Sequence, residues 1–98
     1  MYATLIEKGR RSRKLHIIDS EDIYEVVYKA GAATERVLVD GDLVYSAGND
    51  LHSGKVWYSP SIKFPIGKLS AIIGVKINWR FAIDAFSLKV EGHELHVE

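Results

Sequence analysis

The chain has 98 residues, with 13 Lys and Arg against 13 Asp and Glu, so its formal net charge is zero. Apolar residues make up 47 %, as in folded globular proteins, and the absence of cysteine excludes disulfides, thiolate zinc sites and Fe–S clusters. Balanced charge argues against a dedicated nucleic-acid binder, and no apolar run approaches the roughly 20 residues that span a bilayer. The start, Met1 to Glu7, lacks the features of a signal peptide. We therefore expect a single cytoplasmic domain over residues 1–98 with no membrane segment.

Short runs of alternating apolar and polar residues, rich in β-branched and aromatic side chains, recur between turn residues along the whole chain. The strand candidates are 2–7, 13–18, 23–29, 35–40, 42–47, 55–58, 62–66, 69–78, 80–84, 86–90 and 93–97, some of which can merge. A helix over 21–29 is the one competing interpretation, and its β-branched residues argue against it. The pattern predicts an all-β fold, an antiparallel β-sandwich or flattened barrel of about nine strands.

Two dipeptides predict tight hairpins, because Asp40-Gly41 and Glu91-Gly92 fit the central positions of a type I′ turn. The first turn sets the pairs Val39–Asp42, Leu38–Leu43, Val37–Val44 and Arg36–Tyr45. The second sets Lys89–Glu94, Leu88–Leu95 and Phe86–Val97. This second register places Leu95 and Val97 on the core face and His96 on the solvent face.

The segment 69–79 is the strongest strand and is expected to be central. Its core face holds Leu69, Ala71, Ile73, Val75, Ile77 and Trp79. Gly74 faces away from the core and indicates a bulge or a close approach by another chain. Pro60 and Pro65 cannot donate to a sheet ladder, so the segments around them are expected to be edge strands or bulged. The polar stretch 47–55 is predicted to be an exposed loop.

Several stretches occur in the order found in one known family. They are Glu35-Arg36-Val37-Leu38-Val39-Asp40-Gly41, Ile62-Lys63-Phe64-Pro65-Ile66-Gly67, Ala71-Ile72-Ile73-Gly74-Val75 and Phe86-Ser87-Leu88-Lys89-Val90-Glu91-Gly92-His93-Glu94-Leu95. Over residues 35–97 the chain resembles the Fas apoptotic inhibitory molecule family. The resemblance implies an antiparallel β-sandwich that is not an enzyme and that works through protein contacts. The first thirty residues do not match it.

Cations gather in the first fourteen residues, where the predicted turn Lys8-Gly9-Arg10-Arg11 is followed by Arg13. One interpretation is a site for an anionic partner (an acidic protein, a phospholipid head group or an RNA backbone), with Lys8, Arg10, Arg11 and Arg13 as the candidate residues. The favoured interpretation is a solvated turn whose charge is balanced by Glu21, Asp22 and Glu25 of the next strand.

Adjacent aromatic residues supply a second set of candidates. Trp57 and Tyr58 face opposite sides of a strand, as do neighbours in Trp79-Arg80-Phe81. The outward rings, with Arg80, could line a ligand groove or form a contact between copies. The alternative is that both sheet faces are partly covered, which would give Trp57 or Tyr58 a packing role. Trp57, Tyr58, Trp79 and Arg80 are therefore the interaction or ligand candidates.

Catalytic and metal-binding patterns are weak. His93 and His96 are three residues apart, which does not suit a metal pair on a strand, and Asp50-Leu51-His52-Ser53 lies in a polar loop that does not orient a triad. We expect no enzyme activity, no metal and no cofactor. The favoured function is a protein-interaction domain that can form a homodimer. The alternative is a small-ligand or carbohydrate-binding module that uses the exposed aromatic rings.

Overall fold

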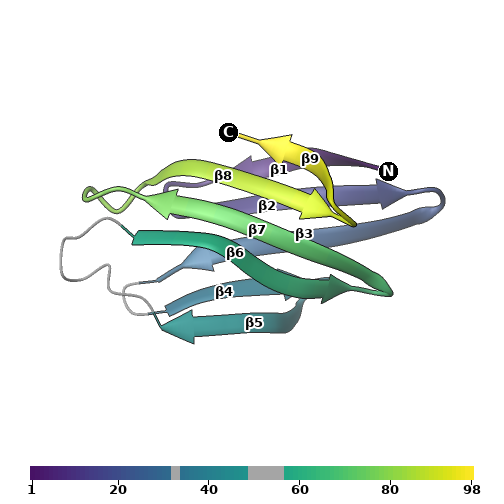
Figure 1. Cartoon of the computed structure of the whole chain (residues 1–98), viewed down its shortest axis with the longest axis horizontal. Helices are drawn as coiled ribbons and strands as arrows, with labels where there is room; N and C mark the ends of the chain where they lie inside the picture. Colours follow the sequence, from purple (N-terminus) through teal and green to yellow (C-terminus); the bar gives the residue numbers. More distant parts are fainter. Residues whose placement is uncertain (32–33, 49–56) are drawn as a thin grey trace.

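A computed structural model of the chain describes residues 1–31, 34–48 and 57–98. They form nine antiparallel strands in two sheets that face each other as a sandwich (Figure 1). The first sheet holds β1 (Tyr2–Lys8), β2 (Ser12–Asp19), β3 (Asp22–Ala30), β4 (Thr34–Val39) and β5 (Asp42–Gly48). The second holds β6 (Trp57–Ile66), β7 (Leu69–Ile77), β8 (Ile83–Val90) and β9 (His93–Val97).

Both sheets are meanders in which every strand pairs with its neighbour in the chain. The sheets do not close into a barrel, so the predicted sandwich is confirmed and the flattened barrel is excluded. The interpretation of 21–29 as a helix is wrong, because these residues form the β2–β3 turn and most of β3. The predicted loop 47–55 begins later than expected, since Ala47 and Gly48 belong to β5, and its remainder lies outside the described residues.

The core follows from the two-residue alternation of the strands. The buried apolar residues of the first sheet are Leu15, Ile17, Val26, Tyr28, Ala30, Val37 and Val39. Those of the second sheet are Ile62, Phe64, Ile66, Ala71, Ile73, Val75, Ile77, Phe86, Leu88 and Val90. The rings of Tyr28 and Phe86 meet across the two layers, with centroids 5.8 Å apart. β7 contributes the predicted core positions up to Ile77, but Trp79 lies beyond the end of the strand and is 62 % exposed.

In the first predicted hairpin, the turn and the two pairs next to it are confirmed, whereas the following two predicted pairs are wrong. Asp40 and Gly41 both have positive φ, as a type I′ turn requires, and Leu38 pairs with Leu43. A bulge then shifts the register, so that Val37 pairs with Tyr45 and Arg36 with Ser46. Because residues directly opposite each other share a face, the bulge turns Tyr45 toward the core side with Val37.

The second hairpin departs from its prediction in the same way. Glu91 and Gly92 have positive φ and Lys89 pairs with Glu94, but the next pair is Leu88 with His96, not with Leu95. The extra residue reverses the faces predicted for the end of β9. The His96 ring lies 6.2 Å from the Phe86 ring on the core side, and Val97 is 63 % exposed.

A third irregularity explains Gly74. β6 is an edge strand, and its register shifts between Ser59 and Ile62, around Pro60. This confirms the prediction that the segments containing the prolines are edge strands or bulged. A Cβ atom on Gly74 would lie 2.9 Å from Ser87 Oγ and 3.3 Å from the Pro60 carbonyl oxygen. The close approach that glycine allows is therefore made by the neighbouring strands of the same sheet.

We predict that Gly74→Ala lowers the free energy of unfolding by about 1–2 kcal/mol, because the added methyl group overpacks this contact. Urea denaturation measures the change. Ser87→Ala removes the nearer of the two contacting atoms, so the double variant G74A/S87A should recover part of the loss. An unchanged denaturation midpoint for the single variant would contradict this account.

A candidate interface at the basic end of the sandwich

The predicted cationic turn and the Trp79 loop lie together at one end of the sandwich. The β1–β2 turn contains Gly9, Arg10 and Arg11, and the β7–β8 loop contains Trp79 and Arg80. The Arg10 guanidinium donates through Nη2 to the Arg80 carbonyl oxygen, and the Ile83 amide donates to the Arg10 carbonyl oxygen at 2.8 Å. We call Lys8, Arg10, Arg11, Trp79 and Arg80 the basic end.

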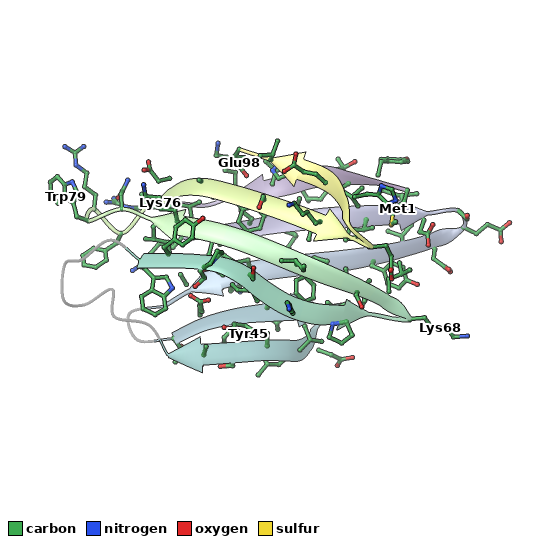
Figure 2. All side chains as sticks on the ribbon, in the orientation of Figure 1. Met1, Tyr45, Lys68, Lys76, Trp79 and Glu98 are labelled. Carbon is green, nitrogen blue, oxygen red and sulfur yellow. The ribbon has the colours of Figure 1, made fainter. Side chains whose placement is uncertain are left out.

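Asn78 shapes the loop that presents Trp79 and Arg80. Its Oδ1 accepts hydrogen bonds from the backbone amides of Arg80 at 2.9 Å and Ala82 at 3.3 Å. Such side-chain-to-backbone bonds are typical of asparagine at turns. Phe81 adopts a φ of 59° and packs on the core, whereas Trp79 points outward, at the opposite end of the molecule from Met1 and Lys68 (Figure 2).

Trp79 and Arg80 form one surface unit. The Arg80 guanidinium carbon lies 4.9 Å from the centroid of the Trp79 ring, a cation–π contact. The contact holds the guanidinium beside a large exposed ring without occupying its hydrogen-bond donors. An apolar anchor therefore lies next to a fork of donors that suits carboxylates.

Arg13 differs from the other predicted cations because it is an interior residue. Its side chain is only 3 % exposed, and its Nε donates to the Glu98 carboxylate at 2.9 Å. Its Nη1 donates to the carbonyl oxygens of Gly9 and Ser12, which fixes the β1–β2 turn from inside. Arg13 therefore positions the basic end and offers no surface to a partner.

The Glu98 carboxylate contacts three side chains, those of Arg13, Lys8 and His96. Lys8 Nζ lies 3.4 Å from Glu98 Oε1, and His96 Nε2 lies 2.9 Å from Oε2. Burial alone would raise the pKa of Glu98, but hydrogen bonds from Arg13, His96 and Lys8 outweigh it and hold this pKa at about 2. Glu98 thus stays ionised at neutral pH and compensates the buried Arg13.

The acidic residues expected to balance the cationic turn are elsewhere. Ser12 of β2 pairs with Lys29, whereas Asp19 pairs with Asp22, so Glu21 and Asp22 lie at the far end of the β2–β3 hairpin. Seven steps along a strand separate the two ends, which is about 23 Å. Glu25 pairs with His16, with Oε2 and Nε2 3.6 Å apart. Within the described residues, no carboxylate lies within ion-pair distance of Arg10, Arg11 or Arg80.

Trp57 faces inward and holds a buried carboxylate. The Glu35 side chain is fully buried, and it accepts hydrogen bonds from Trp57 Nε1 and, at 2.9 Å, from Ser59 Oγ. These bonds join β4 of one sheet to β6 of the other. Burial, and then the Glu35 carboxylate, raise the pKa values of both Tyr28 and Tyr45. Trp57 therefore has a structural partner in the interior.

Tyr58 lies on the opposite side of β6, as predicted, and is 64 % exposed. It lines a shallow groove of about 340 Å³ on the outer face of the second sheet, together with Gly74, Lys76, Lys89, Glu94 and Val97. Trp57, Trp79 and Arg80 do not line this groove. The four aromatic-site candidates therefore separate into an interior residue, a sheet-face residue and a pair at the basic end.

The two buried charged residues carried a signal in the sequence. Arg13 is in phase with Leu15 and Ile17, and Glu35 is in phase with Val37 and Val39, so alternation places both side chains on the core face. Their partners, Glu98 and the pair Trp57 and Ser59, are more than twenty residues away in sequence. Local pattern cannot reveal such partners.

Other features of the described residues bear on function. No group of three or more His, Asp or Glu side chains there could hold a metal ion, and no helix there is long and apolar enough to span a membrane. The predicted Asp50, His52 and Ser53 constellation lies outside the described residues. Comparison of the chain with protein-family models, curated proteins and solved structures finds no match in any of the three. The resemblance to the Fas apoptotic inhibitory molecule family stays a prediction.

We predict that Glu98→Gln lowers the free energy of unfolding at pH 7 by about 2 kcal/mol, because the buried Arg13 loses its ionic partner. The depressed pKa of Glu98 stabilises the fold fully above its ordinary value of 4.5, and this contribution disappears as pH falls toward about 2. Urea midpoints for the wild type and the variant should therefore converge between pH 4.5 and 2. Glu94→Gln, an exposed change on β9, the strand that directly precedes Glu98, is the matched control. A constant gap at all pH values would contradict the assignment.

We further predict that Trp57→Phe lowers the free energy of unfolding by about 2 kcal/mol, because the buried Glu35 carboxylate loses the hydrogen bond from the indole N–H. If that donor is the cause, Glu35→Gln should cost less in the W57F background than in the wild type, with a coupling energy of about 1 kcal/mol or more. A double-mutant cycle by chemical denaturation measures this coupling. Additive effects would show that the indole acts only through packing.

Proposed function

We propose that this chain is a non-enzymatic protein-interaction domain that binds an acidic protein surface through its basic end. The observation that carries the proposal is the contact between the Arg10 guanidinium and the Arg80 carbonyl oxygen, which brings the turn with Arg10 and Arg11 to the loop with the exposed Trp79. These three arginines are exposed, and no carboxylate of the described residues lies within ion-pair distance of them. Arginine and tryptophan are the residue types most enriched in interface hot spots.

The basic end is held in place before any partner arrives. Arg13 bonds the backbone of the β1–β2 turn, and Asn78 bonds the backbone of the Trp79 loop. The backbone bond between Ile83 and Arg10 then ties the two segments together. Fixed backbone lowers the ordering cost of binding, so a small surface can bind with useful affinity.

A protein partner fits this surface better than an extended polyanion such as RNA. The chain has no net charge, and the turns at the other end of the sandwich carry exposed carboxylates, which repel a long anionic strand. Single-stranded nucleic acids also require several stacking rings, and the basic end offers only Trp79 among the described residues. A local patch of Asp and Glu has the matching size and charge.

The alternative, a small-ligand or carbohydrate module, has less support. It needs several exposed rings around one groove, but Tyr58 lines the outer groove without Trp57 or Trp79. Trp57 is already engaged with Glu35 in the interior.

We predict that a short oligo-L-glutamate peptide, used as a probe for a local acidic patch, binds the protein at low salt and is released as ionic strength rises. The variant R11Q/R80Q leaves the backbone bonds of both segments in place and should weaken binding at least tenfold. The control K63Q/K89Q removes the same charge from the outer sheet face. Isothermal titration calorimetry compares the three proteins. Equal binding by both variants, or no binding by the wild type, would overturn the proposal.

A further inference from the structure

The neutral chain is divided into a cationic and an anionic end. The β2–β3, β4–β5 and β8–β9 turns lie at the end of the sandwich opposite the basic end (Figure 1). These turns carry the exposed or half-exposed acidic residues Asp19, Glu21, Asp22, Asp40, Asp42, Glu91 and Glu94. Met1 and Lys68 lie at the same end, where the acidic residues outnumber them (Figure 2). We call the part of this surface around Glu21 and Asp22 the acidic end.

The acidic end also has exposed apolar side chains beside its charges. Tyr2 pairs with Ile18, and Ile18 pairs with Ile23, so these three form a row across β1, β2 and β3 on the outer face. Ile23 is 64 % exposed and Tyr2 is 59 % exposed. Ile23 directly follows Glu21 and Asp22 in the chain. Large exposed apolar side chains flanked by charge are characteristic of contact surfaces.

We infer that the partner of the basic end is the acidic end of a second copy of this chain, in a head-to-tail contact. This inference rests on the proposed function. Arg11 and Arg80 of one copy face Glu21 and Asp22 of the next, and Trp79 packs on Ile23. Both ends have exposed apolar side chains, and each end carries the charge sign opposite to that of the other, so complementarity of charge identifies the occupant.

The contact is heterologous, since two different surfaces of the same protein meet. Such contacts leave one free end of each kind and continue until a ring closes or a filament grows. The two shorter extents of the molecule are 23 and 22 Å, so a flat contact between ends covers at most about 500 Å² of each copy. A total of at most about 1,000 Å² over both copies is the size of a weak association.

Charge reversal at each end separately tests the contact. R11E/R80E reverses the two charges proposed for the contact at the basic end, and E21K/D22K reverses the two proposed at the acidic end. We expect the wild type to gain mass with concentration in sedimentation velocity at low salt, and each reversed variant to self-associate at least tenfold more weakly. An equimolar mixture of the two variants should associate again, because it contains one native acidic end and one native basic end. K63E/K89E, with the same change of charge on the outer sheet face, is the control.

The outcomes separate the two proposals. A wild type that stays monomeric at low salt, or a variant mixture that does not associate, overturns the head-to-tail contact. If the short oligo-L-glutamate peptide still binds the wild type and not R11Q/R80Q, the proposed interaction surface stands with a different acidic partner. Thermal unfolding followed by circular dichroism verifies that the reversed variants are folded.

Trp79→Ala, which changes no charge, should weaken self-association at least threefold, and an unchanged association would remove Trp79 from the contact.

Discussion

The buried guanidinium of Arg13 is the constraint on which the basic end depends. It compensates Glu98 beside β9 and simultaneously bonds the carbonyl oxygens of Gly9 and Ser12 in the β1–β2 turn. One interior cation thereby fixes the backbone that presents Arg10 and Arg11 to solvent. A buried charge is costly unless it is fully paired, and Arg13 meets that condition with donors directed at three separate groups.

Polar contacts join the two sheets along both sides of the sandwich. Glu35 accepts from Trp57 and Ser59 on the side of β4 and β6, while Arg13 and Glu98 meet on the side of β2 and β9. The Tyr28 and Phe86 rings pack between these contacts. Apolar sheets can slide over each other at little cost, whereas these directional bonds are made in only one relative placement of the layers.

The division of charge between the ends follows from topology. In an up-and-down meander, successive turns fall at alternate ends of the sheet, so the composition of every second turn decides the charge of one end. The β1–β2 turn and the β7–β8 loop carry arginines, whereas the β2–β3 and β4–β5 turns carry Asp and Glu. A net charge of zero therefore conceals a strongly polar molecule, and its surface favours oriented contacts over nonspecific ones.

Alternation along the chain determined most of the strands and core residues and the two type I′ turns, because these depend on side-chain period and on φ at two positions. It was wrong at Trp79, predicted to be core, and at 80–84, predicted to be a strand, because the chain forms a loop between Ile77 and Ile83. Period also placed Arg13 and Glu35 on the core face. Tertiary structure alone decided the two bulges, which turn the side chains of Tyr45 and His96 to the face opposite the predicted one, because packing beyond the turn fixes where a bulge forms. It alone brought Arg10 of the first sheet against Arg80 of the second, seventy residues away, because this contact depends on how the sheets stack, which no local pattern records. The distance of Glu21 and Asp22 from the cations has a local cause, since β2 places its two turns at opposite ends of the sheet.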